Sequence, residues 1–156
     1  MEDTLKRSLI SSLMLLAMVA TAASVSIGAH QKPAIAAPAD VAKPPADAQR
    51  TPSGIYWKVL KPGTGTTHPT PMSTVTMDYT GWTTDGKMFD SSIVNGKPLV
   101  YQLNGLIKGW VEGVQMMVTG EKRRLWIPGN LGYDNNPSPG VPHGMLVFDM
   151  ELISFK

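Results

Sequence analysis

The chain has 156 residues, of which 42% are hydrophobic and 17% charged, and its formal net charge is +2. This composition is typical of a globular protein, and the length fits one ordinary domain with an appendage. The chain has no cysteine, which excludes disulfides, thiol nucleophiles, iron–sulfur clusters and cysteine zinc sites. Except for the cluster at residues 122–124, its basic residues are scattered along the chain, so we expect no nucleic-acid binding.

Residues 1–29 have the pattern of a secretory signal peptide. Lys6 and Arg7 precede an uncharged run over residues 9–29, in which an apolar centre is followed by small residues. The alternative is an uncleaved membrane anchor, but such a span needs about 20 predominantly apolar residues, and this run is diluted by serines, a threonine and a glycine. We therefore favour cleavage. In both cases the rest of the chain is exported, to the periplasm or the medium.

Residues 30–52 are rich in alanine and proline. A segment of this composition buries little apolar surface and is stiffened by polyproline geometry, so we expect a disordered linker. From residue 53 onward, strand and turn signals replace it. The sequence therefore divides into a signal peptide (1–29), a linker (30–52) and one folded domain (53–156).

Strands dominate the first half of the expected domain. The runs 55–60, 74–80 and 99–103 are rich in β-branched, aromatic and aliphatic residues, and the second alternates in polarity, as strands do. Asp85-Gly86 predicts a tight turn after the second run, with Met88-Phe89 beginning the return. We expect antiparallel pairing around this turn.

The second half begins with a change of period. Apolar residues spaced i, i+3, i+4, i+7 and i+11 predict a helix over residues 106–117; they are Ile107, Trp110, Val111, Val114 and Val118. Gly120 follows as a stop signal. Residues 124–127 and 145–155 predict two further strands, separated by a long loop rich in glycine and proline. The elements together indicate an α+β fold with an antiparallel sheet and a helix on one face.

The usual equipment of most enzyme classes is missing. His30, His68 and His143 are far apart and have no spacing typical of zinc ligands. The sequence has no phosphate-binding loop, no dinucleotide fingerprint and no Gly-x-Ser-x-Gly elbow. We therefore expect no metal, no cofactor, and no hydrolytic, redox or phosphoryl-transfer chemistry.

Four sequence blocks occur in order along residues 53–156. They are DYTGW…DGKMFDSS (78–92), LIKGWVEG (106–113), GEKRRLWIP (120–128) and LVFDMEL (146–152). Together they resemble the signature of the FK506-binding-protein (FKBP) type peptidyl-prolyl cis-trans isomerases, in a single-domain, exported, bacterial-like form. The resemblance implies a half-wrapped antiparallel sheet around one short helix, with an aromatic pocket between them.

The resemblance also implies roles for individual residues. The catalytic set would be Tyr79, Phe89, Asp90, Trp110, Tyr133 and Phe148, and the substrate-binding set Leu99, Ile107 and Val141. Trp110 would form the floor of the pocket, and the Tyr133 hydroxyl and the Ile107 N–H would donate hydrogen bonds to the substrate. Asp90 would shape the pocket by hydrogen bonding, without transferring a proton.

Two departures from the family pattern concern the rim of the pocket. Leu99 stands where an aromatic residue is common, and Asp134 stands where glycine is common. The loop over residues 135–142 is short and carries three prolines. We expect these positions to affect which sequences around proline are accepted.

The implied activity is rotation about Xaa-Pro bonds without covalent chemistry or cofactor, in the folding of exported proteins. The resemblance also implies inhibition by macrolides such as FK506 and rapamycin, and we expect a monomer. Two alternatives remain open: a binding module that recognises proline loops with little turnover, and, with less support, a surface protein that contacts a host protein.

Overall fold

The structure is a computed structural model that describes residues 33–156. The predicted signal peptide lies outside the described residues. The strands are β1 (Gln49–Arg50), β2 (Tyr56–Lys61), β3 (Thr74–Thr83), β4 (Met88–Ser91), β5 (Leu99–Gln102), β6 (Lys122–Ile127) and β7 (Leu146–Phe155). The helices are α1 (Ser92–Asn95) and α2 (Lys108–Gln115), with short 3-10 turns η1 (Leu103–Gly105) and η2 (Gly129–Leu131).

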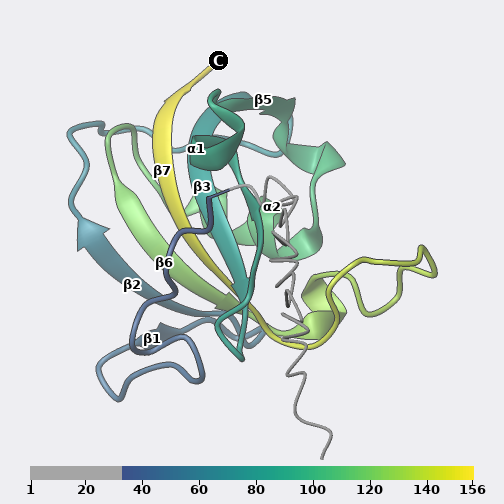
Figure 1. Ribbon diagram of the computed structural model, residues 1–156. Coiled ribbons are helices and arrows are strands. Elements are labelled where there is room, and N and C mark those ends of the chain that lie inside the picture. Colours follow the sequence, from purple (N-terminus) through teal and green to yellow (C-terminus); the bar gives the residue numbers. More distant parts are fainter. Residues whose placement is uncertain (1–32) are drawn as a thin grey trace, which may run out of the picture. The chain divides into compact units, whose positions relative to one another are not determined.

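All strands belong to one antiparallel sheet with the order β1-β2-β6-β7-β3-β4, and β5 pairs with β3 as well (Figure 1). The centre is the pair β3 and β7, which run alongside each other from Val75 opposite Phe155 to Thr83 opposite Leu146. The expected antiparallel sheet with one principal helix on a face is confirmed.

The core lies between α2 and the inner face of the sheet. Alternate residues of β6 and β7 point to this face, as the period of two requires, among them Leu125, Ile127 and Phe148. Two glycines let α2 approach closely, because a Cβ on Gly109 would overlap Ile127 and one on Gly113 would overlap Leu125. The helix therefore lies in close contact with the sheet at both glycines.

Helix α2 is shorter than the predicted 106–117. Ile107 is its N-cap and has an extended backbone with ψ 150°, while residues 103–105 before it form η1. At the other end the Met117 N–H donates to the Val114 carbonyl, three residues back, which closes the last turn. Ile107 before the helix and Met117 after it also pack into the core, so the apolar pattern extends past the ends of the helix.

The expectation of a disordered linker is wrong for residues 33–52. Residues 33–48, which we call the N-terminal strap, lie across the outer face of the sheet, and β1 follows directly (Figure 1). Val41 is 9% exposed and forms a second core with Trp82, Trp126 and Val147. The outer face thus presents two large indoles, and the strap removes them from water despite its polar, proline-rich composition.

Within residues 33–156 no helix has the length and apolar character that a membrane crossing requires.

Candidate functional site

A cavity of about 130 Å³ opens between α2, the inner face of β3 and the loop after η2. Its lining is predominantly apolar and aromatic. The lining residues are Tyr79, Phe89, Asp90, Leu99, Leu106, Ile107, Trp110, Tyr133 and Phe148. A small concave site with an apolar lining and few polar groups is the usual form of a ligand pocket.

The base of this cavity is a series of rings in edge-to-face contact. Trp110 of α2 lies 4.9 Å from Tyr79 and 5.3 Å from Phe148 between ring centroids, at interplanar angles of 79° and 89°. Phe148 in turn lies 5.5 Å from Phe89 at 88°. Each such pair contributes about 0.5–1.5 kcal/mol beyond the burial of its area, so the rings hold one another in place.

Gly81 of β3 makes room for two of these rings. A Cβ at this position would lie 2.7 Å from both Phe89 Cζ and Phe148 Cε1. Any side chain here would push the rings apart or into the cavity. The glycine is therefore part of the site although it does not line it.

Asp90 holds Tyr79 by a short hydrogen bond. The Tyr79 hydroxyl donates to Asp90 Oδ2 at 2.5 Å, while Asp90 Oδ1 accepts from the Ser91 N–H at 2.8 Å and from Asn95 Nδ2 at 3.2 Å. Burial, together with the hydrogen bond and charge of Asp90, raises the pKa of Tyr79 above its ordinary value. Tyr79 thus stays protonated at neutral pH and its hydroxyl is committed to the carboxylate.

The two serines after Asp90 organise the turn that carries it. Ser91 caps α1 by accepting from the Val94 N–H at 3.3 Å. Ser92 Oγ accepts from the Tyr79 N–H at 2.9 Å and donates to Asp78 Oδ1 at 2.8 Å. The segment therefore binds back to β3, which positions Asp90 against Tyr79.

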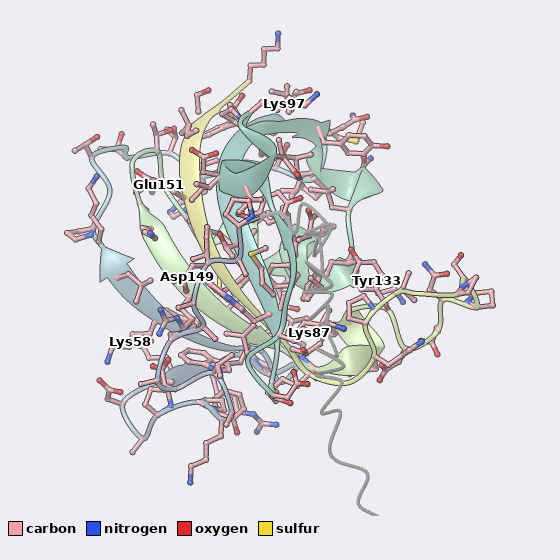
Figure 2. The ribbon with its side chains drawn as sticks, in the orientation of Figure 1. Lys58, Lys87, Lys97, Tyr133, Asp149 and Glu151 are labelled. Atoms are coloured by element: carbon pink, nitrogen blue, oxygen red, sulfur yellow. The ribbon has the colours of Figure 1, made fainter. Side chains whose placement is uncertain are left out.

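Two donors at the cavity have no acceptor within residues 33–156: the Tyr133 hydroxyl and the backbone N–H of Ile107, the N-cap of α2. Tyr133 stands at the start of the long loop after η2 (Figure 2). Burial and the charge of Asp90 raise the pKa of Tyr133, so its hydroxyl is protonated at neutral pH. Both groups can donate to a bound carbonyl.

Trp110 Nε1 is a third polar group without a partner in the described part of the chain, and its side chain is buried. A buried donor left unpaired costs about 1–3 kcal/mol. Such groups are rare in folded proteins, and Arg123 Nη1, which is not at the cavity, is another one in the described part of the chain.

The structure brings together eight of the nine residues expected at the site. Val141 is half-buried in the long loop and does not line the cavity. Leu106 does line it and was missed, although it directly precedes Ile107 at the start of the helical block. Asn95 was missed as well, because its bond to Asp90 depends on the fold of α1.

Among residues 33–156 no three histidine, aspartate or glutamate side chains are close enough together to hold a metal ion. The cavity itself is lined by no serine, histidine or lysine. The residues present can bind and orient an apolar ring and a carbonyl, but they include no nucleophile activated by a base.

Known proteins match this chain in both sequence and structure. Residues 65–153 match the family model described as FKBP-type peptidyl-prolyl cis-trans isomerase. The "FKBP-type peptidyl-prolyl cis-trans isomerase FkpA" of Aeromonas hydrophila is 41% identical over 107 residues, which cover 68% of this chain and 40% of that protein. A "peptidyl-prolyl cis-trans isomerase" of Schizosaccharomyces pombe is 42% identical over 107 residues, covering 66% of this chain and 96% of the yeast protein.

The crystal structure of FkpA from Escherichia coli superposes with a TM-score of 0.67 at 37% identity, covering 72% of this chain and 53% of that one. The chain spans less than two thirds of the length of several of these relatives, 40% in the case of the Aeromonas protein. The match to the family model covers more than half of the chain and includes every residue that lines the cavity, from Tyr79 to Phe148. The chain belongs to the FKBP-type peptidyl-prolyl cis-trans isomerase family.

Proposed function

We propose that this protein accelerates cis-trans rotation about Xaa-Pro bonds, without a cofactor, by binding the proline ring in the cavity over Trp110. The observation that carries the proposal is the combination of an aromatic floor with two unpaired donors at the rim, Ile107 N–H and Tyr133 hydroxyl. The family to which the chain belongs supports the same activity.

The obstacle to this rotation is kinetic. The barrier is about 18–20 kcal/mol because the C–N bond is partly double. The two end states of an Xaa-Pro bond differ by only about 0.5–1 kcal/mol. Binding energy therefore speeds the exchange only if the twisted amide is bound more strongly than the planar one.

An apolar pocket satisfies this condition. Resonance is lost at the twisted transition state, so the amide is less charge-separated there than in its planar form. The rings of Trp110, Phe89 and Phe148 surround the imide with few polar groups, which disfavours the planar form more than the twisted one. The Ile107 N–H and the Tyr133 hydroxyl hold the substrate carbonyl and so fix one side of the rotating bond.

The remaining polar groups of the pocket have an orienting role in this mechanism. Asp90 accepts three hydrogen bonds, one of them from Tyr79. Neither residue has to exchange a proton with the substrate during rotation. We assign to Asp90 the task of holding the Tyr79 ring against Trp110. Leu99 and Leu106 complete the apolar wall, and Val141 would contact residues that flank the proline from the loop.

We further propose that the protein is exported, with a signal peptide over residues 1–29 that is cleaved, and that it acts as a monomer on exported polypeptides. FK506 and rapamycin would occupy the same cavity. A Legionella longbeachae relative at 38% identity carries the name "Outer membrane protein MIP", which supports an extracytoplasmic location. The isomerase domain would comprise residues 53–156, covered on its outer face by the strap.

NMR exchange spectroscopy on an Ala-Leu-Pro-Phe peptide tests the activity without a coupled protease. We expect catalytic amounts of the protein to speed cis-trans exchange, and FK506 to abolish the acceleration. A binding module, the alternative function, would bind the peptide and broaden its signals in proportion to occupancy while exchange stayed at the uncatalysed rate. That result would overturn the proposal.

A further inference from the structure

The N-terminal strap contacts the sheet at two separate places on its outer face. Near β6, the Trp126 indole N–H donates to the Asp40 carbonyl at 3.1 Å, and Arg124 donates to the Asp40 carboxylate at 2.5 Å. Near β4, the Trp82 indole N–H donates to the Ile35 carbonyl at 2.9 Å. The strap is therefore held by one buried tryptophan near its start and by another near its middle.

The second contact reaches the strand that carries a wall of the cavity. The Ile35 N–H points to the sulfur of Met88 at 3.3 Å, and both side chains pack against the second core around Trp82 and Trp126. A Cβ on Gly86, in the turn before β4, would lie 3.5 Å from the Ala37 methyl group. The strap thus covers the turn and the first residue of β4.

Strand β4 has one strand neighbour in the sheet. It has four residues at the end of the sheet and pairs only with β3, with an irregular register between Gly81 and Trp82. Because side chains alternate along a strand, Met88 points to the outer face and Phe89 to the cavity. A shift of Met88 is therefore passed directly to Phe89.

We propose that Ile35 and Trp82 are positioning residues of the pocket: by holding the strap against Met88, they set the place of Phe89 from the opposite face of the sheet. The effect on turnover rests on the proposed isomerase function; the effect on Phe89 does not. On this proposal the strap, which precedes the family match that begins at residue 65, is a functional part of the isomerase domain and not only a linker.

The two tryptophan contacts of the strap provide a matched pair of variants. Trp82→Phe and Trp126→Phe each remove one indole N–H that donates to a strap carbonyl, but only Trp82 lies opposite Met88. A merely structural strap would make the two variants equivalent. Ile35→Ala and Val41→Ala form a second, milder pair if either tryptophan variant fails to fold.

The experiment uses the full chain and four readouts: the thermal midpoint, the affinity for FK506, kcat/KM for peptide exchange, and the NMR signals of Phe89. Phe89 is one of only three phenylalanines in the chain. We expect both tryptophan variants to lower the midpoint. Trp82→Phe should also shift the Phe89 signals and weaken FK506 binding and kcat/KM by about threefold to tenfold, since a misplacement of an ångström can cost about a hundredfold. Trp126→Phe should change FK506 affinity and kcat/KM by less than about twofold each, as expected of a residue outside the pocket.

Equal effects of the two variants on FK506 affinity, or unshifted Phe89 signals in Trp82→Phe, would overturn the proposal. If the unaltered protein does not catalyse exchange, the proposed function fails, but the Phe89 signals still decide whether the strap positions the pocket.

Discussion

Replacing Gly81 by alanine tests how closely the pocket rings are packed against β3. The new methyl group would lie 2.7 Å from both Phe89 Cζ and Phe148 Cε1. Phe148 is only 2% exposed and is held at 5.3 Å from Trp110, so it cannot move away into solvent. Extra volume in a packed core costs about 1–3 kcal/mol. At about 4 °C per kcal/mol for a domain of this size, the thermal midpoint should fall by about 4–12 °C.

The same variant should lose function beyond its loss of stability, because displaced rings narrow the cavity. We expect kcat/KM for peptide exchange, measured well below the new midpoint, to fall about tenfold, which corresponds to about 1.36 kcal/mol at the transition state. Gly105→Ala is a suitable control: its methyl would come 2.6 Å from a Tyr101 ring that is 51% exposed and free to swing outward. An unchanged midpoint and an unchanged kcat/KM in Gly81→Ala would refute the packing described here.

Three further predictions concern the polar groups of the pocket. Asp90→Ala should lower the free energy of unfolding by about 1–3 kcal/mol in a urea titration, because it leaves the Tyr79 hydroxyl without its acceptor. Asp90→Asn keeps an acceptor oxygen and should lose less. Equal losses in the two variants would contradict the role of Asp90 as the acceptor for Tyr79. Tyr133→Phe should change the free energy of unfolding by less than about 0.5 kcal/mol and lower kcat/KM about threefold to tenfold. A lower free energy of unfolding together with full activity would show that the hydroxyl donates to a group of the protein and not to the substrate. Since folding raises the pKa of Tyr79 and Tyr133, the native state holds their protons more tightly than the unfolded state, whose tyrosines titrate near about pH 10. Stability should therefore be retained below about pH 10 and decrease above it, and a double Tyr→Phe variant should flatten that decrease in urea titrations between about pH 8 and 11.

Much of the domain could be predicted from local patterns. Period-two alternation located the last strand to within one residue, predicted at 145–155 and observed at Leu146–Phe155. The change to helical period located α2, and Asp85-Gly86 located the turn between β3 and β4, where Gly86 has φ 85°. In each case the signal lies within a few residues of the element that it predicts.

The strap could not be predicted in this way because its partners are distant in sequence. The bond from Trp82 to Ile35 spans 47 residues and that from Trp126 to Asp40 spans 86. Alanine and proline carry no local signal for such contacts. The available hint was on the sheet: Trp82 and Trp126 fall on the face opposite the predicted core, and two large indoles on one face require a cover.

The residues of the pocket, too, could be predicted only in part. Sequence blocks identified the aromatic residues by resemblance, and the structure gathers them around one cavity. The contributions of Gly81 and Asn95 depend on which atoms the fold places next to them, and the spacing of residues in the sequence does not predict those contacts. Val141 was placed by alignment across a loop of altered length, where residue-by-residue correspondence is weakest.

The central claim is that a proline ring rests on Trp110 while its imide bond rotates. An isotope-filtered NOE experiment, recorded on the protein with an exchanging Ala-Leu-Pro-Phe peptide, tests it directly. We predict NOEs between the proline ring protons and the Trp110 indole, and both these NOEs and the accelerated exchange should disappear when FK506 is added. Accelerated exchange with no NOE to Trp110, or NOEs that persist after FK506 abolishes the acceleration, would contradict the account.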